Sequence, residues 1–518
     1  MILSLLLALA IGGASEPRPF PPDAELYFDT VAARRHLAFL SSDEMRGRDT
    51  PSRELEQAAD YIVSEFKRIG LEPINGSYDQ VYDLERLDLR LPTSMYFTRG
   101  TDTFAFSVKT DFMPFEQTGE GVITNARVVF AGYGITAPEY SYDDYAGIDV
   151  KGAVVVVLRG EPDNADTTRF RGKQFTRHGS NSEKLKLARS KGAVGLLVID
   201  ALRTPRKPFV SGYPWPSVFP NLSRASRPLQ LPDSTKRIPS IHIGERPTIL
   251  LFDSLAGVVS ITRAIDSTLV PRSREIAGVR FSCSVALDHE IVKVRNVVGL
   301  LRGSETPDEY AVIGAHYDHV GVGKANAEGD SIYNGADDNG SGTTGLLLSA
   351  QALAASTQRP SRSIVYVAFS GEEKGLLGSK AYVRASPLPL SKCVAMSNMD
   401  MIGRCETNKL SIGGNERCPD LMKLNEEANT SLAKPFNLAY DIEQYFFRSD
   451  QASFAMKRIP VIFYFTGEHK DYHKPGDEIS KINMADLVGI TRLATHVMWT
   501  ATQMPRGTYV PAGFEDND

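Results

Sequence analysis

The chain has 518 residues, and at about 150 residues per domain this length indicates roughly three domains. Lys and Arg number 58 against 63 Asp and Glu, and the net charge of −5 excludes the strongly basic surface that nucleic-acid binding requires. Hydrophobic residues make up 42% of the sequence, which excludes intrinsic disorder and indicates a large folded protein with more than one compact unit.

The first residues form a candidate export signal. Met1 to Ala14 is an apolar run with the length of a signal-peptide core, and it ends in the small residues that a signal peptidase prefers. Residues 1–15 are therefore predicted to be a signal peptide, which makes the protein exported, either periplasmic or extracellular. Because a basic n-region is missing, an apolar start to a cytosolic chain is the alternative. No other stretch approaches the roughly 20 apolar residues of a membrane helix, so no stable membrane span is expected.

The four cysteines are too few for a disulfide scaffold. Cys405 and Cys418 flank a short Gly-rich segment and are the candidates for a disulfide in an exported protein. Cys283 and Cys393 lie in apolar, strand-like runs and are expected to be buried. The absence of a Cys-x-x-Cys pair argues against a zinc site built from thiolates.

Apolar periodicity divides the chain into two kinds of region. In the first half the expected helices are 26–39, 55–69 and 183–190, and the expected strands are 126–133, 153–158, 193–199 and 238–243. After residue 276 the expected strands are 278–287, 296–301, 310–316, 363–370, 392–399, 409–412 and 459–465, and the expected helices are 342–355, 375–385, 418–432 and 484–503. Strands that alternate with helices indicate a mostly parallel sheet covered on both faces, whose ligands lie at the carboxyl ends of its strands.

Histidines and carboxylates follow five of these elements, where such a sheet would bind a ligand. They are His316, Asp318 and His319 in AHYDHVG, Asp337 and Asp338 in NGADDNGSG, Glu372 and Glu373 in GEEKG, Asp400 in NMDMIGR, and His473 in DYHKPGDE. A single residue of this kind is usually structural, but five sites on successive elements indicate a metal centre. Two imidazoles and three carboxylates carry −3, so two divalent cations and one hydroxide neutralise them. Imidazole and carboxylate ligands suit zinc, and two metals can hold both a nucleophile and a substrate oxygen.

The segments HYD, GADDNGSG, GEEKGLLGS, NMDMIGR and DYH, in this order, resemble the co-catalytic di-zinc aminopeptidase family, of the bacterial leucyl aminopeptidase and glutamate carboxypeptidase superfamily. The resemblance implies an α/β fold of the zinc exopeptidase (phosphorylase/hydrolase-like) type, with a mixed, mostly parallel sheet between helices. FAGYG, KGAVVVVLRG and KGAVGLLVID resemble the protease-associated (PA) domain, a β-rich α+β insert. Two domains follow: a discontinuous peptidase domain over 20–119 and 269–508, and an inserted PA domain over 120–268.

The resemblance also implies roles for single residues and two Zn²⁺ per chain. His316 and Asp400 would hold one zinc, Glu373 and His473 the other, and Asp338 would bridge them. The family pattern selects Asp338 over Asp337 as the bridge, and it places a cis peptide at Asp338–Asn339. The general base would be Glu372, and the oxyanion would be stabilised by Tyr472. Asp318 would orient His316, and His319 would be a pocket wall or a structural hydrogen-bonding residue rather than a ligand.

The leading prediction is a metal-dependent aminopeptidase that removes N-terminal residues from peptides or proteins. A carboxypeptidase or glutaminyl cyclase of the same superfamily is the first alternative, because Arg404 and Arg448 lie near the motifs and could hold a substrate carboxylate. A non-catalytic binding or receptor-like module is the second, although relatives of that kind lose ligands that are present here. The inserted domain is expected to border the active-site cleft and to restrict substrate size.

Overall fold

The computed structural model describes residues 17–166, 168–170, 176–204, 215, 228–233 and 237–511. The predicted signal peptide, residues 1–15, lies outside them. The chain divides into two compact units, a split unit made of Met1–Asp83 and Val292–Asp518, and an inserted unit made of Leu84–Ile291. The predicted boundaries of the insert, 120 and 268, both lie within the inserted unit, because its long strands begin before the first and end after the second.

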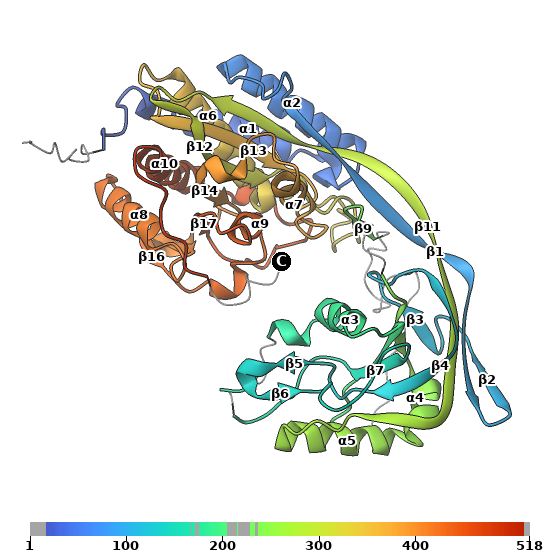
Figure 1. Cartoon of the computed structure of the whole chain (residues 1–518). Coiled ribbons are helices and arrows are strands. Elements are labelled where there is room, and N and C mark those ends of the chain that lie inside the picture. The colour runs from blue at the N-terminus through green and yellow to red at the C-terminus, as the bar shows by residue number, and fades with distance from the viewer. Residues whose placement is uncertain are drawn as a thin grey trace, which may run out of the picture. The chain divides into compact units, whose positions relative to one another are not determined.

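The split unit is built on a mixed, mostly parallel sheet (Figure 1). Its strand order is β16-β15-β17-β14-β12-β13-β11, in which β12, β13, β14 and β17 run parallel to their neighbours within that set. The strands are β11 (Arg274–Leu301), β12 (Thr306–His316), β13 (Arg362–Phe369), β14 (Cys393–Met399), β15 (Lys409–Gly413), β16 (Asn437–Ala439) and β17 (Val461–Phe465). The central strands are apolar and almost wholly buried, as in sheets covered on both faces. The predicted fold class is confirmed.

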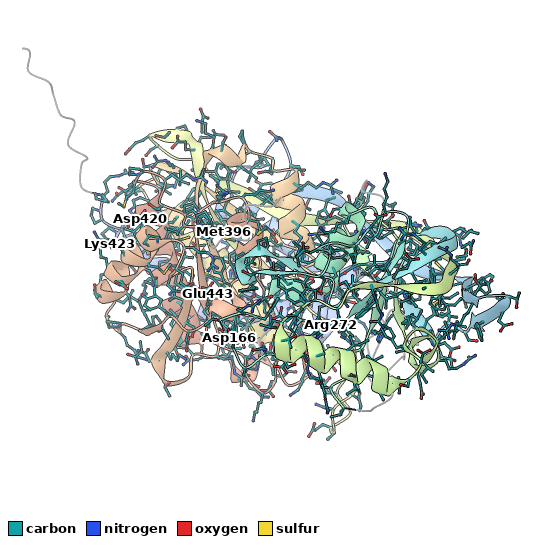
Figure 2. All side chains as sticks on the ribbon, turned by 60° about the horizontal axis from the view of Figure 1, so that its bottom comes forward. Asp166, Arg272, Met396, Asp420, Lys423 and Glu443 are labelled. Atoms are coloured by element: carbon teal, nitrogen blue, oxygen red, sulfur yellow. The ribbon has the colours of Figure 1, made fainter. Side chains whose placement is uncertain are left out.

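Helices pack around this sheet (Figure 1). They are α1 (Thr30–Leu40), α2 (Arg53–Ile69), α6 (Gly342–Ala355), α7 (Leu377–Arg384), α8 (Pro419–Ser431), α9 (Gln451–Ala455) and α10 (Met484–Ala501). In α2 the buried residues recur at helical spacing, Ser52 caps the first turn, and Gly70 ends the helix in the left-handed conformation. Figure 2 shows Asp420 and Lys423 on the outer side of α8, whereas Met396 of β14 is fully buried.

The inserted unit has its own sheet and helices. Its strand order is β11-β4-β7-β8-β10-β3, in which β4 (Gly121–Phe130), β7 (Val154–Leu158), β8 (Gly195–Ile199) and β10 (Ser240–Ile243) are parallel and β3 (Phe112–Pro114) is antiparallel. The long strand β1 (Asp79–Arg99) pairs with β11 and with β2 (Asp102–Phe106). Helices α3 (Asn181–Ser190), α4 (Glu245–Phe252) and α5 (Leu255–Thr268) complete the unit.

Several sequence predictions differ from the structure. The strands expected at 278–287 and 296–301 are one strand, β11, and the helix expected over 26–39 is a short 3₁₀ turn followed by α1, because Asp29 caps a new helix there. Cys405 and Cys418, the candidates for a disulfide, are both buried free thiols. The Sγ of Cys405 donates to Lys409 O at 3.0 Å, and the Sγ of Cys418 accepts from Val461 N at 3.2 Å.

Helix composition bears on the membrane prediction. Among the described residues, no single helix combines the length and the apolar character of a membrane span. The pair α4 and α5, bent by 72°, reaches that threshold when its two helices are taken together.

Candidate metal centre

The predicted ligands converge at the carboxyl edge of the sheet in the split unit. His316 is the last residue of β12, Glu373 follows β13, and Asp400 follows β14 directly. Asp338 lies in the turn before α6, and His473 lies in the segment after β17. Because β12, β13, β14 and β17 are parallel, their carboxyl ends share one edge, and the residues that follow them are brought together.

The donor atoms form two groups that share one carboxylate. In the first, His316 Nε2 lies 3.4 Å from Asp338 Oδ1 and 3.4 Å from Asp400 Oδ1. In the second, His473 Nε2 lies 3.2 Å from Asp338 Oδ2 and 3.0 Å from Glu373 Oε2. Ligands that surround one zinc tetrahedrally at 2.0–2.2 Å are about 3.3–3.6 Å apart, so both groups have close to the spacing of zinc ligands. Each oxygen of Asp338 faces one group, which is the arrangement of a bridging carboxylate.

The charges of these groups are not balanced within the protein. Burial, together with the charge of Glu373, raises the pKa of Asp338 to about 8. Although burial favours a neutral ring, the carboxylates of Asp338 and Glu373 raise the pKa of His473 to about 10. The buried atoms Asp400 Oδ1, Glu373 Oε1 and His473 Nε2 have no hydrogen-bond partner among the described residues. Buried polar atoms are normally paired, so this cluster of unpaired carboxylate and imidazole atoms fits divalent cations.

Hydrogen bonds to its main chain fix the turn that carries Asp338. Asp338–Asn339 is a cis peptide, as predicted. The carboxylate of Asp477 accepts hydrogen bonds from the main-chain N–H of Asp337 and of Asp338, each at about 3.0 Å. Asp337 points away from the donors and accepts from Gly403 N at 2.6 Å. Asp337 therefore fixes the turn, while Asp338 faces both donor groups.

Glu372 lies beside the donors and belongs to neither group. Its Oε2 is 4.0 Å from His316 Nε2, and its main-chain N–H donates to Asp318 Oδ1 at 3.1 Å. Burial raises the pKa of Glu372 well above its usual value. Asp318 was predicted to orient His316 through its carboxylate; the hydrogen bond instead joins His316 Nδ1 to the main-chain carbonyl of Asp318 at 3.2 Å, with the carboxylate at 3.6 Å. The Asp318 carboxylate also accepts from Thr50 Oγ1 at 2.8 Å.

A pocket opens beside the two groups, and its lining combines polar and apolar side chains. The residues that line it are Asp338, Glu372, Asp400, Met401, Tyr445, Arg448, Ser449, Phe463, Phe465, Glu468 and Tyr472. The ring of Tyr472 stacks on His473 with a centroid distance of 3.9 Å. His473 has a φ of +52°, and Met401, next to Asp400, has a φ of +54°. Left-handed backbone in residues other than glycine is strained, and here it occurs beside two predicted ligands.

The two arginines considered for a substrate carboxylate differ in their surroundings. Arg404 is largely buried and pairs with Asp471 at 3.2 Å, away from the pocket lining. Arg448 lines the pocket, stacks on the ring of Tyr445 and lies 3.5 Å from Glu468. Of the two, only Arg448 is therefore in a position to meet a substrate.

The structure adds supporting residues that sequence reasoning missed. Ser449 donates to Asp400 Oδ2 at 2.7 Å and thereby orients that carboxylate. The fully buried guanidinium of Arg48 donates to the carbonyls of Asn334 at 2.8 Å and Gly335 at 3.0 Å, so it fixes the start of the turn before Asp338. Burial lowers the pKa of Arg48 to about 10. Asp477 had a usable signal, since it lies in the DYHKPGDE motif, whereas Arg48 and Ser449 stand in segments with no recognisable pattern.

His319 also lies at this centre. It is fully buried, and its Nδ1 is 2.7 Å from Glu373 Oε1 and 3.6 Å from Asp338 Oδ2. Burial lowers the pKa of His319 to about 3. Its ring therefore belongs with the Glu373 and His473 group rather than with its sequence neighbour His316.

Comparison with known proteins gives two matches to families. Residues 296–498 match the family described as Peptidase family M28, and residues 118–246 match the PA domain. A probable glutamate carboxypeptidase, AMP1, of Arabidopsis thaliana is 25% identical over 374 residues, which cover 66% of this chain and 47% of that protein. A probable zinc metalloprotease of Pyrenophora teres f. teres is 38% identical over 112 residues, which cover 22% of this chain and 23% of that protein. The chain thus spans less than half the length of these curated relatives.

A solved structure extends the match to nearly the whole chain. The aminopeptidase from Aneurinibacillus sp. strain AM-1 aligns with 94% of this chain and 96% of its own, with a TM-score of 0.53 and 18% sequence identity. At this level of identity the alignment establishes a shared fold.

Proposed function

We propose that the chain is a di-zinc aminopeptidase that removes N-terminal residues from peptides. It combines a match to peptidase family M28, a family of zinc metallopeptidases, with an inserted PA domain. The observation that carries the proposal is the position of Asp338, whose two oxygens each face a separate group of zinc-type donors. His316 and Asp400 would hold one ion, and His473 and Glu373 the other.

The reaction would divide between the ions and the protein side chains. When bound, the two zinc ions supply Lewis-acid chemistry, which polarises a carbonyl and lowers the pKa of a water. Glu372 takes a proton from the attacking water at its carboxylate and gives it to the leaving amine. Its buried position, which raises its pKa, suits a group that must hold a proton between these two steps. Burial also raises the pKa of Tyr472, so its phenol stays protonated at neutral pH and can donate to the developing oxyanion.

The pocket supports an N-terminal substrate. The donor carboxylates give it acidic groups that attract an ammonium, and Met401, Phe463 and Phe465 give it an apolar wall for the first side chain. The test is hydrolysis of a peptide with a free N-terminus against its N-acetylated form, each with and without a chelator. Cleavage of the free peptide alone, abolished by the chelator, is expected. Equal cleavage of both peptides would contradict the aminopeptidase assignment.

Carboxypeptidase activity is the second candidate. It is favoured by Arg448, which lines the pocket, and by the relatives that are named as glutamate carboxypeptidases. Arg448 is paired with Glu468, however, and a substrate carboxylate would have to displace that partner. Release of the last residue from an N-blocked dipeptide measures this activity directly, and Arg448→Met would abolish it.

We also propose that the protein is exported, from the apolar run at residues 1–14. Expression of the full chain followed by fractionation and N-terminal sequencing tests this. The expected result is a product outside the cytoplasm that starts soon after residue 14. An uncleaved cytoplasmic product would overturn it.

A further inference from the structure

The side chain of His319 has no role in the mechanism above, yet it lies among the donor atoms. It stands three residues after His316, but it faces the other donor group. Its Nδ1 is 2.7 Å from Glu373 Oε1 and 3.6 Å from Asp338 Oδ2, and the residue has no solvent exposure. The two carboxylates nearest to its ring are therefore the two that also face His473.

The hydrogen bonding of the His319 ring is more informative about its role than its distances to the carboxylates. Although two carboxylate oxygens lie near Nδ1, neither nitrogen of His319 makes a hydrogen bond to any described residue. His473 Nε2 behaves in the same way, since it lies 3.2 and 3.0 Å from oxygens of Asp338 and Glu373 and hydrogen-bonds to neither. The ring nitrogens of His319 and His473 therefore border the same space, between the carboxylates of Asp338 and Glu373. In this centre that space is where a cation would be held.

Resting on the proposed di-zinc function, we infer that His319 is a metal ligand through Nδ1, which gives the Glu373 and His473 site a fourth protein donor. The four donors of that site are two imidazoles and two carboxylates, the set that suits zinc. The His316 and Asp400 site has three protein donors, counting the shared Asp338.

This difference gives the two sites different properties. Zinc bound by four protein ligands is characteristic of closed, structural sites, whereas three protein ligands leave a position for water or substrate. The Glu373 and His473 site would therefore hold its ion more tightly, and the ion at the His316 and Asp400 site would be the more exchangeable one, with a position left for water or substrate.

The rival role for His319 is to position Glu373 through a hydrogen bond. Asparagine separates the two roles, because its amide nitrogen can occupy the place of Nδ1 and donate a hydrogen bond but is a poor ligand for zinc. His319→Leu removes both functions, and His319→Asn restores only the donor. His242→Leu is the matched control, because His242 is equally buried, has no hydrogen-bond partner for either nitrogen among the described residues, and lies on β10 in the inserted unit.

The experiment measures zinc affinity by competition with a chelator, the visible spectrum of the Co²⁺-loaded protein, and the melting temperature of the metal-free protein. Wild type is expected to bind two ions of unequal affinity. His319→Leu and His319→Asn are both expected to weaken the tighter site by more than about 100-fold, beyond the 10–100-fold typical of losing a supporting residue. Both should also lower the intense Co²⁺ absorption of a four-coordinate site, whereas His242→Leu should change neither property.

Wild-type affinity in His319→Asn would overturn the ligand role in favour of positioning, and wild-type affinity in His319→Leu would exclude both roles. His319→Leu could lose zinc affinity because its metal-free form is unfolded. In that case His319→Asn decides: it must lose zinc affinity while its metal-free form keeps the melting temperature of wild type. If wild type itself binds no zinc, the di-zinc proposal fails. That outcome is distinct from failure of this inference, in which wild type binds two ions that do not depend on His319.

Discussion

Both units bury charged side chains, but the hydrogen bonding of these side chains differs between the units. In the inserted unit, Lys184 is fully buried and its Nζ donates to main-chain carbonyls, including Leu158 O at 3.0 Å. Asp144, also fully buried, accepts from the main-chain N–H of Tyr133 and Ile135 and from the hydroxyl of Tyr142. The polar atoms of both side chains thus have hydrogen-bond partners within the unit, although burial raises the pKa of Asp144 to about 7 and lowers that of Lys184 to about 7.

In the split unit the buried groups at the sheet edge are not satisfied. Asp400 Oδ1, Glu373 Oε1 and His473 Nε2 have no hydrogen-bond partner among the described residues. Both units have parallel strands, so topology alone does not create a site. A buried charge is therefore a weak sign of function, whereas several buried ligand-type atoms that converge without hydrogen-bond partners indicate a bound cation.

The largest effect is expected from Asp338→Asn, because this residue serves both donor groups. Loss of a bridging charge should release zinc from both sites and lower activity by at least about 10³-fold, since metal catalysis contributes several kcal/mol. Zinc content by mass spectrometry and hydrolysis of a free peptide measure the two effects.

Asp337→Asn is the control, since an amide oxygen can still accept from Gly403 N. It should keep both ions. A greater zinc loss in Asp337→Asn than in Asp338→Asn would show that the bridge is misassigned.

The next effect separates catalysis from metal binding. Glu372→Gln should lower turnover by about 10²–10⁴-fold, the usual contribution of a general base, while zinc content stays at the wild-type value. The side chain keeps its size and polarity, so a folding defect is not expected. Near-normal turnover, or loss of zinc, would each be incompatible with the role proposed for Glu372.

Much of this site could be predicted from sequence, because each ligand either ends or follows an apolar strand or stands in a recognisable motif. His316 ends a strand that reads as apolar, and Asp338, Glu373, Asp400 and His473 stand in short motifs. The mixed sheet could be predicted from the alternation of strands and helices, and the cis peptide at Asp338–Asn339 from the resemblance to the aminopeptidase family.

The remainder depends on contacts between segments distant in sequence. The face to which His319 points is set by packing, since Gly335 lies directly against its ring. The continuity of β11 could not be inferred, because the polar residues 288–293 read as a break and pairing with β1 carries the strand through them. Helices α4 and α5 are short and separated by Asp253 in the left-handed conformation, so neither gives a long apolar period.

A third prediction concerns Lys184 and Asp144, the buried charged side chains of the inserted unit. Lys184→Met should lower the free energy of unfolding by about 3–5 kcal/mol, because it removes a cation that acts on the buried Asp144 and deprives carbonyls such as Leu158 O of a donor. Zinc content should not change. Denaturant unfolding measures the loss.

Lys186→Met, on the exposed side of α3, is the matched control and should shift the stability by no more than about 0.5 kcal/mol. Equal effects in the two variants would remove the contrast between the two units.

A smaller effect is expected from Ser449→Ala, which removes the hydroxyl that donates to Asp400. Loss of such a supporting hydrogen bond weakens metal binding by about 10–100-fold. The effect should fall on the exchangeable ion of the His316 and Asp400 site. Ser349→Ala removes another buried hydroxyl of the same unit, one that accepts from Thr495 Oγ1, and should leave zinc affinity unchanged. Similar losses in both variants would point to a general packing defect.

The last effect is the pH dependence of zinc binding. In the metal-free protein the pKa of Asp338 is about 8 and that of His473 is about 10, so both groups hold protons at pH 7. Zinc needs both groups deprotonated, and its affinity should therefore fall by at least about tenfold for each pH unit below 8. Calorimetry in buffers of different ionisation enthalpy should detect proton release at pH 7. Binding without proton release would contradict the proposed ligand pair.

The unpaired donors of the split unit should together hold two metal ions. Native mass spectrometry of the folded wild-type chain, supplied with zinc and dialysed, counts these ions. Two zinc ions per chain are expected, and a folded protein that retains one ion or none would show that the donors do not form a two-metal centre.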